Sequence, residues 1–166
     1  MSSGDAVFVY GLLTLPEVVY AITGKHYAMQ QASLADHKSY GVSQQHGETP
    51  IPALTHSPGY VQHGQLLLDV YPAELEKLDF FEELDSGLYL REKVRVQSLG
   101  QWLDAWCYIA GPALVPYLAG EWSVQQVSEE HKKHLITQLI PSMLTTYHNL
   151  HASSGTTTKA TPLSED

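Results

Sequence analysis

The first part of the chain alternates between a short apolar run, a turn and an amphipathic segment. Residues 6–10 form a continuous apolar run that ends at Gly11, which is typical of a strand buried on both faces. Residues 14–17 read Thr-Leu-Pro-Glu, a capping-box pattern with proline in the first helical turn. We therefore expect a strand, a tight turn at Gly11, and a helix that ends at Gly24.

Short segments rich in β-branched and aromatic residues follow. They predict four strands, at 27–34, 37–44, 51–55 and 61–70. The segments 45–50 and 57–59 contain glycine and proline and predict turns between these strands. Further along, 89–97 and 102–109 are separated by Ser-Leu-Gly and predict a β-hairpin.

Residues 71–82 predict a helix that carries a glutamate on its apolar side. Pro72 suits the first turn, where its missing N–H has no cost. At about 100° per residue, one stripe is formed by Leu75, Leu78 and Phe81. Glu82 projects between the two leucines of this stripe.

A carboxylate in such a position is costly unless it is paired, or unless it is protonated because its pKa has risen. Glu82 is therefore a candidate for proton transfer near neutral pH. The alternative is a structural role, either a buried ion pair with a residue such as Arg91 or a cap for nearby backbone.

The C-terminal third predicts one long helix and a tail. Residues 123–126 form a second capping-box pattern before an apolar stripe, and Pro141 should end or kink that helix. Residues 152–166 are almost entirely small, polar or acidic, which predicts disorder. We expect one domain over residues 1–150 and a disordered tail over 151–166.

The net charge of the chain argues against two classes of binding partner. The formal net charge of −9 repels phosphate backbones and anionic lipids, so we expect neither nucleic acid nor a membrane as a partner. No apolar stretch is long enough to span a bilayer, and the first residues lack the features of a signal peptide. These features favour a cytoplasmic protein.

Cysteine and histidine usage argues against several kinds of site. Cys107 is the only cysteine, which excludes an internal disulfide and a multi-thiolate metal site, and its strand context indicates a packed thiol. His131 and His134 share a helix face but have no third ligand nearby in sequence. We predict neither a metal nor a cofactor.

The turn at residues 10–14 is the second candidate site. A glycine lets a ligand approach the backbone closely, and the free N–H groups at the start of the following helix suit a carboxylate or phosphate. The turn lacks the further glycines of a dinucleotide loop and the lysine of a P-loop. Tyr89 could bind a ligand or the Glu82 carboxylate, or it could be a strand residue whose tip reaches solvent.

These motifs, taken in order, resemble the gamma-glutamylcyclotransferase-like family. The strand and turn at 7–13 resemble its Val-Phe-Val-Tyr-Gly-Ser/Thr-Leu signature, and 78–82 with 89–91 resemble its Leu-Asp-x-x-Glu and Tyr-x-Arg block. The matching segments between and after these are 52–54, 64–66 and 120–122. The last of them, Gly-Glu-Trp, is closest to the plant avirulence-induced branch.

The resemblance implies an α+β fold, a small mixed β-barrel with peripheral helices. It also implies an acyltransferase activity in which a gamma-glutamyl amine or peptide is converted to 5-oxoproline and the free amine. Glu82 would be the general acid/base. The substrate-binding residues would be Tyr10, Gly11, Leu12, Leu13 and Tyr89. This chemistry is intramolecular, so it requires no enzyme nucleophile and no metal.

Two departures from the family pattern keep alternatives open. Leu12 replaces the usual small hydroxyl residue, and the turn at 83–87 is longer and more acidic. Both leave room for a non-catalytic domain that binds a small carboxylate or a gamma-glutamyl ligand. A protein-interaction module that uses the C-terminal helix and tail is a third, less favoured hypothesis, because it gives Glu82 no role.

Overall fold

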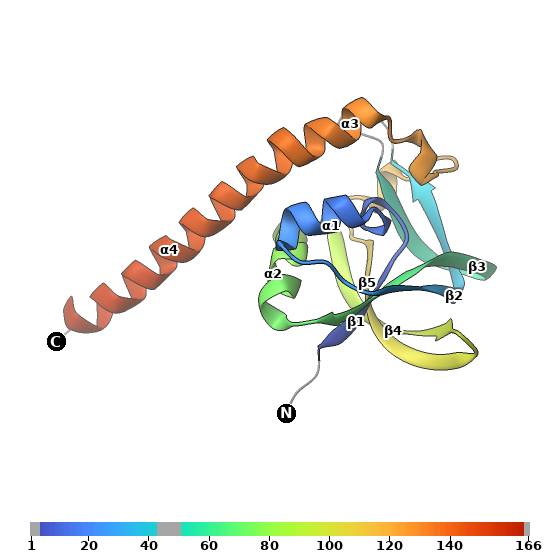
Figure 1. Cartoon of the computed structure of the whole chain (residues 1–166), viewed down its shortest axis with the longest axis horizontal. Helices are drawn as coiled ribbons and strands as arrows, with labels where there is room; N and C mark the ends of the chain where they lie inside the picture. Colours follow the sequence, from blue (N-terminus) through green and yellow to red (C-terminus); the bar gives the residue numbers. More distant parts are fainter. Residues whose placement is uncertain (1–3, 43–50, 165–166) are drawn as a thin grey trace.

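Five strands close into a barrel in the order β1-β3-β2-β4-β5 (Figure 1). The computed structural model describes residues 4–42 and 51–164, with side chains as far as residue 152. The strands are β1 (Asp5–Val9), β2 (Met29–Gly41), β3 (Pro52–Val70), β4 (Tyr89–Ser98) and β5 (Gln101–Ala110). Strand β1 pairs antiparallel with β3 and parallel with β5, so the first strand closes the barrel against the last. The expected mixed β-barrel is confirmed.

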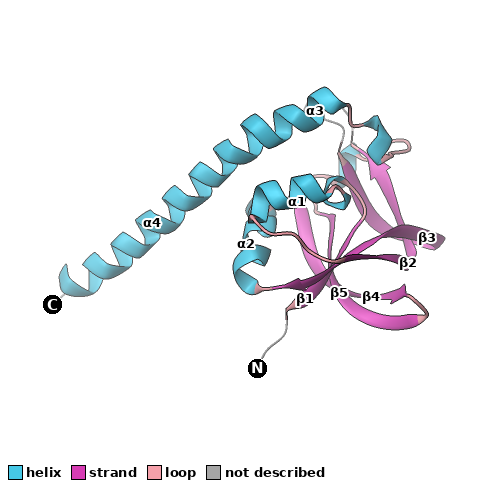
Figure 2. Cartoon of the chain, in the orientation of Figure 1, coloured by secondary structure: helices cyan, strands magenta, loops and turns pink. Residues whose placement is uncertain are grey.

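Helices cover one side of this barrel (Figure 2). They are α1 (Pro16–Thr23), α2 (Pro72–Phe81), α3 (Glu129–His134), the π-helix η6 (Leu135–Leu139) and α4 (Ile140–Ser164). Short 3₁₀ turns are η1 (Leu12–Thr14), η3 (Leu84–Ser86), η4 (Val115–Tyr117) and η5 (Val124–Gln126). Helices α1, α2 and α4 contact one another, and α4 then extends beyond the barrel (Figures 1 and 2). Helix α1 ends at Gly24 with φ 77°, as predicted.

Alternation along the strands divides the core into two clusters. Phe8, Leu66 and Cys107 belong to a cluster formed by strand residues alone, which fills the barrel. Val7 and Leu78 belong to the other cluster, which joins the outer face of the barrel to the helices. The Cys107 thiol is fully buried, which confirms the packed thiol predicted from its strand context.

The four strands expected between residues 27 and 70 are two long strands. The predicted break near Asp36 and the predicted turn at 57–59 are opposite halves of one bulge, where the pairing register shifts between Ala35 and His37. Asp36 has φ 60°, and its Oδ1 accepts a hydrogen bond of 2.9 Å from the Gly59 N–H. The prediction of separate strands was wrong because turn-forming residues can be absorbed as a bulge when the neighbouring strand supplies the remaining hydrogen bonds.

Both predicted capping boxes were wrong. The Thr14 hydroxyl donates to the Gly11 carbonyl at 2.6 Å within the preceding turn, so it leaves α1 without a side-chain cap. Ser123 caps only the short turn η5. The long C-terminal helical run begins instead at Ser128, whose side chain accepts a 3.0 Å hydrogen bond from the His131 N–H.

Pro141 does not end the C-terminal helix, since α4 begins at Ile140 and continues past it. The π-helix η6 ends at Leu139, two residues before the proline. Proline has no N–H for the carbonyl four residues earlier, and the wider turn is one way to accommodate that missing bond. Helix α4 is described through Ser164, and the division into a domain at 1–150 and a tail at 151–166 stays a prediction. Within the described part of the chain, no helix is long and apolar enough to cross a membrane.

Candidate active site

A cavity of about 310 Å³ lies between the turn that follows β1 and the C-terminal end of α2. Every residue predicted for the site borders it, namely Tyr10, Gly11, Leu12, Leu13, Glu82 and Tyr89. The remaining lining residues are Phe8, Val9, Ile51, Pro52, Phe81, Glu83, Leu88, Tyr108, Leu135 and Leu139. The fold therefore brings the two candidate sites of the sequence together around one space.

The turn after β1 supplies backbone groups to this cavity. The first bond of η1 runs from the Thr14 N–H to the Gly11 carbonyl at 2.9 Å. The N–H groups of Leu12 and Leu13 precede that bond, so they have no partner within the turn. Free amide N–H groups of this kind can donate hydrogen bonds to a bound carboxylate.

Gly11 lies directly against Pro52, at the start of β3. A Cβ atom on Gly11 would collide with the Cγ atom of the proline ring. This close approach of two chain segments favours glycine at position 11. The contact fixes the turn against the barrel wall.

Glu82 occupies the C-cap position of α2, and its backbone N–H donates to the Leu78 carbonyl at 2.9 Å. Among the described residues, no hydrogen bond or ion pair reaches its side-chain carboxyl group. Burial of that carboxyl, followed by the negative charges of Glu83 and Asp79, raises the pKa of Glu82 to about 8. The group is thus able to gain and lose a proton near neutral pH.

The arginine considered as an ion-pair partner for Glu82 pairs instead with Asp79. Arg91 Nε lies 3.0 Å from Asp79 Oδ1, and the Arg91 guanidinium stacks on the Trp106 ring with 4.2 Å between Cζ and the ring centroid. The Tyr108 hydroxyl donates to the same Asp79 oxygen at 2.7 Å. The alternative in which Arg91 neutralises Glu82 was therefore wrong.

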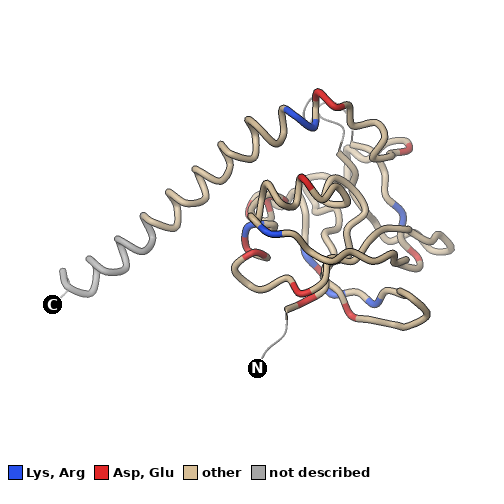
Figure 3. Tube along the Cα trace, viewed as in Figure 1, with Lys and Arg blue, Asp and Glu red and all other residues tan. Residues whose placement is uncertain are grey.

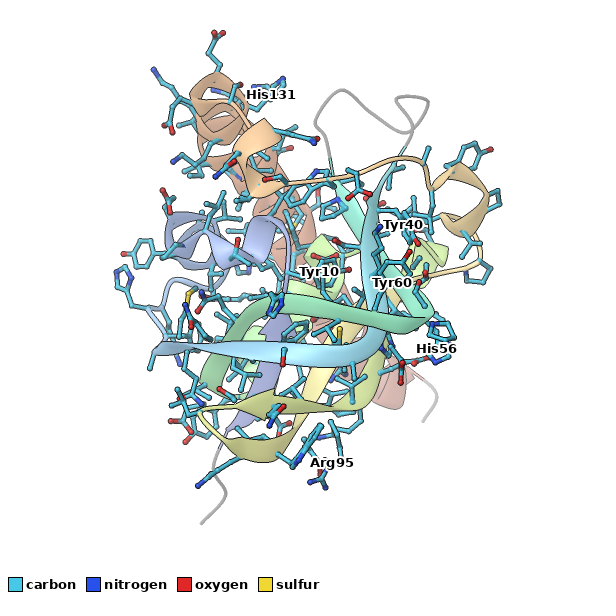
Figure 4. The ribbon with its side chains drawn as sticks, turned by 90° about the vertical axis from the view of Figure 1, so that its right-hand side faces the viewer. Tyr10, Tyr40, His56, Tyr60, Arg95 and His131 are labelled. Atoms are coloured by element: carbon cyan, nitrogen blue, oxygen red, sulfur yellow. The ribbon has the colours of Figure 1, made fainter. Side chains whose placement is uncertain are left out.

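Two tyrosine hydroxyl groups near the cavity are already engaged by backbone carbonyls. Tyr89 donates to the Pro52 carbonyl and Tyr10 donates to the Tyr108 carbonyl, each at 2.6 Å. Burial is the main cause that raises the pKa of each phenol well above 10, so both hydroxyls stay protonated. Figure 4 shows Tyr10 near the middle of the molecule, between α1 and the crossing strands β2 and β3. The Tyr89 hydroxyl holds the cavity wall in place and does not bond to Glu82.

Sequence reasoning missed the walls contributed by distant segments. Pro52 and Tyr108 reach the cavity only because β3 and β5 join β1 in the closed barrel. Leu135 and Leu139 come from the π-helix η6, and π-helical turns are frequent at functional sites. The apolar stripe of the last helix was recognised in the sequence, but the packing of η6 against this cavity had no local signal.

Charged groups are spread over the barrel and the first helices, and the part of α4 with described side chains carries no Lys, Arg, Asp or Glu (Figure 3). In the described ranges, no cluster of three or more His, Cys, Asp or Glu side chains could hold a metal ion. His131, labelled in Figure 4, lies at the far end of that view from Arg95 and away from Tyr10.

Comparisons with known proteins agree with this geometry. Residues 7–124 match the family described as gamma-glutamyl cyclotransferase, AIG2-like. The chain is similar to the Arabidopsis thaliana protein At5g39720.1, with 24% identity, 81% of this chain and 87% of that chain covered, and a TM-score of 0.59. It is also similar to the uncharacterised human protein loc79017, with 21% identity, 82% and 100% of the two chains covered, and a TM-score of 0.61.

A solved structure titled gamma-glutamyl cyclotransferase has 21% identity, covers 81% of this chain and 98% of its own, and gives a TM-score of 0.59. At these identities, the structural likeness establishes the fold. No curated protein matches the chain.

Proposed function

The chain belongs to the gamma-glutamyl cyclotransferase, AIG2-like family, and on this premise we propose that it converts a gamma-glutamyl amine or peptide to 5-oxoproline and the free amine. The reaction is an acyl transfer within the substrate. The α-amine of the glutamyl group attacks its own side-chain carbonyl, and the bond between that carbonyl and the leaving nitrogen breaks. The ring that forms is 5-oxoproline.

The turn after β1 would hold the α-carboxylate of the substrate. The free N–H groups of Leu12 and Leu13, with that of Gly11 beside them, offer donors to this carboxylate. Binding at this point bends the glutamyl chain toward a ring-closing geometry. Such positioning replaces the random search for that geometry, and it can lower the reaction barrier by several kcal/mol.

Glu82 would act as general base and then as general acid. It accepts a proton from the substrate ammonium, whose pKa is about 8, so that the amine becomes nucleophilic. It returns a proton to the leaving nitrogen as the carbon–nitrogen bond breaks. A pKa of about 8 matches the ammonium closely, whereas an exposed carboxylate would be too weak a base.

The observation that carries this proposal is the Glu82 carboxyl, which has no hydrogen-bond or ion-pair partner among the described residues and borders the same cavity as the amides of the turn. The test is to incubate the protein with a panel of gamma-glutamyl amines and dipeptides and to measure 5-oxoproline. We expect release by the wild type and a loss of at least about 10²-fold in kcat for Glu82→Gln, which keeps the shape of the side chain but cannot take up the proton. Equal release by both proteins would contradict the role of Glu82.

A binding domain without turnover is the second candidate. It is favoured by one observation: the Tyr10 and Tyr89 hydroxyls are committed to backbone carbonyls, so few polar side-chain groups are left to act on a substrate. Calorimetry with the same panel distinguishes the two functions. Binding by both the wild type and Glu82→Gln, with no 5-oxoproline from any compound, would favour the binding domain.

A further inference from the structure

The cavity has a polar part and an apolar part. Its polar groups include the Glu82 carboxyl and the backbone amides at residues 11–13. Much of the remaining wall is hydrocarbon, contributed by Ile51, Phe81, Leu88, Leu135 and Leu139. If the proposed reaction holds, the glutamyl ammonium and carboxylate occupy the polar part, and the amine that is released occupies the space beside the apolar wall.

Leu135 and Leu139 form one side of this apolar wall. They lie four residues apart on η6, so they belong to the same face of the helical run. Leu135 is 5% exposed and packs into the core, whereas Leu139 is 45% exposed although it borders the cavity. A large apolar side chain that is half exposed at the rim of a cavity gains from any apolar ligand that covers it.

The charges of the lining residues argue against an anionic released group. Among the described residues that line the cavity, Glu82 and Glu83 are the only charged side chains, and no lysine, arginine or histidine is present. A released group with its own carboxylate would therefore meet like charge and no counter-ion. Leu12, which is buried and borders the cavity, contributes a further apolar side chain.

We propose that Leu139, supported by Leu135, is a specificity-determining residue, and that the amine released from the substrate carries an apolar group. The proposal rests on the function proposed above. The cavity volume of about 310 Å³ is near the lower end for ligand pockets, so the apolar group is small.

The test measures kcat/KM for gamma-glutamyl-n-alkylamides from methyl to pentyl, with 5-oxoproline as product. Each added methylene should raise kcat/KM about three- to fourfold while it is buried against the wall, from a transfer free energy of about 0.8 kcal/mol per CH₂. A gamma-glutamyl amide of 1,5-diaminopentane and gamma-glutamylglycine supply cationic and anionic comparisons. The pentyl amide should be turned over with a higher kcat/KM than both.

The variants Leu139→Asn and Leu139→Met separate a specificity role from a structural one. The near-isosteric Leu139→Asn should lower the ratio of kcat/KM between the pentyl and methyl amides by about tenfold, a loss of about 1.4 kcal/mol. Leu139→Met keeps an apolar side chain and should keep most of that ratio. Leu150→Asn is the matched control, because Leu150 is 52% exposed on α4 and does not border the cavity, so its ratio should equal that of the wild type.

The outcomes distinguish this inference from the function on which it rests. A ratio near one in the wild type, or an equal ratio in Leu139→Asn, would overturn the apolar assignment while 5-oxoproline release still supported the reaction. A preference for the diaminopentane amide or for gamma-glutamylglycine would overturn it as well. The absence of 5-oxoproline from every compound would overturn the proposed reaction, and this inference with it.

Discussion

Arg91 Nε lies 3.0 Å from Asp79 Oδ1, and among the residues that the structure describes no positively charged group pairs with Glu82. Asp79 comes three residues before Glu82, at the end of the same helix. Burial raises the pKa of both acids, but only at Asp79 do the Tyr108 hydroxyl and the Arg91 charge oppose that rise. Two carboxylates within one helical turn therefore have different environments, which is how acid–base chemistry is commonly assigned within a site.

The rate of the proposed reaction should depend on the ionisation of Glu82. The base must be deprotonated and the substrate amine protonated for the proposed transfer, so kcat/KM should rise about tenfold per pH unit below the Glu82 pKa of about 8 and fall again above the pKa of the substrate ammonium. The measurement is kcat/KM for one gamma-glutamyl amide between pH 5.5 and 9.5. A profile that is flat from pH 5.5 to 8 would show that no group with this pKa controls the reaction.

Asp79→Asn should shift that profile to lower pH. The substitution removes a negative charge and leaves the Arg91 guanidinium unpaired, and both changes favour ionised Glu82. Burial is the main cause of the raised pKa, so we expect the midpoint to fall by up to about one pH unit and to stay well above that of an exposed glutamate.

Glu76→Gln is the control for this shift, because Glu76 is on the same helix but its charge is not among those that raise the Glu82 pKa. Its midpoint should match that of the wild type. Equal shifts in Asp79→Asn and Glu76→Gln would indicate a general effect of net charge and would contradict the specific coupling.

Glu82 should also make stability depend on pH. Its pKa rises from about 4.3 in the unfolded chain to about 8 in the fold. Between these values the folded state binds more protons, so the free energy of unfolding should fall as pH rises, by at most about 1.4 kcal/mol per pH unit. Below about pH 4 both states are protonated and this contribution to the slope disappears.

Urea unfolding at a series of pH values from 5 to 9 measures this slope. Glu82→Gln removes the titrating group, so its unfolding free energy should fall less steeply with pH than that of the wild type. Glu130→Gln, which removes an exposed carboxylate from α3, should keep the wild-type slope. Parallel curves for the wild type and Glu82→Gln would disprove the raised pKa.

Tyr89→Phe should destabilise the fold. The Tyr89 hydroxyl is buried and donates to the Pro52 carbonyl at 2.6 Å, so its removal leaves a buried acceptor unpaired. We expect a loss of about 1–3 kcal/mol in the free energy of unfolding. Tyr60→Phe is the matched control, since Tyr60 is exposed and should change stability by less than about 0.5 kcal/mol. Equal losses in the two variants would argue against this bond as a support of the cavity wall.

Gly11→Ala should force the turn away from β3. The new Cβ meets the Pro52 ring, and overpacking of this kind typically costs about 1–3 kcal/mol. Pro52→Ala removes the colliding Cγ atom, so the double variant should recover part of the loss. Urea unfolding of both single variants and the double variant gives the coupling energy. Strict additivity would show that the two residues do not limit each other.

The sequence was most informative where a pattern is local. The apolar run of β1, the glycine that ends α1, the helix that carries Glu82 and the hairpin of β4 and β5 were all predicted, because each depends on neighbouring residues. The prediction of a barrel depended on the family resemblance. Periodicity alone cannot specify that β1 pairs in parallel with β5, about one hundred residues away.

The errors arose where tertiary contacts overrode local preference. Ser57-Pro58-Gly59 is typical turn material, yet it lies in a strand because β2 continues alongside it. Thr14 had the sequence context of a helix cap, but its hydroxyl bonds to the Gly11 carbonyl instead. For the site, Glu82 and the Gly11 turn were candidates from the sequence and border one cavity in the structure, and their roles stay a prediction. The leucines of η6 could not be assigned without the packing of the last helix.

The parallel contact of β1 with β5 has a consequence for how the protein is made. Strand β1 is synthesised first, but it can pair on both of its edges only after β5 has been synthesised. Strands β1 and β5 are far apart in the sequence, so their pairing is slow. The Gly11 turn follows β1 directly, so its position depends on that pairing. Because Leu135 and Leu139 of η6 also line the pocket, a nascent chain that ends before about residue 139 has the helix that precedes Glu82 but only part of the pocket wall.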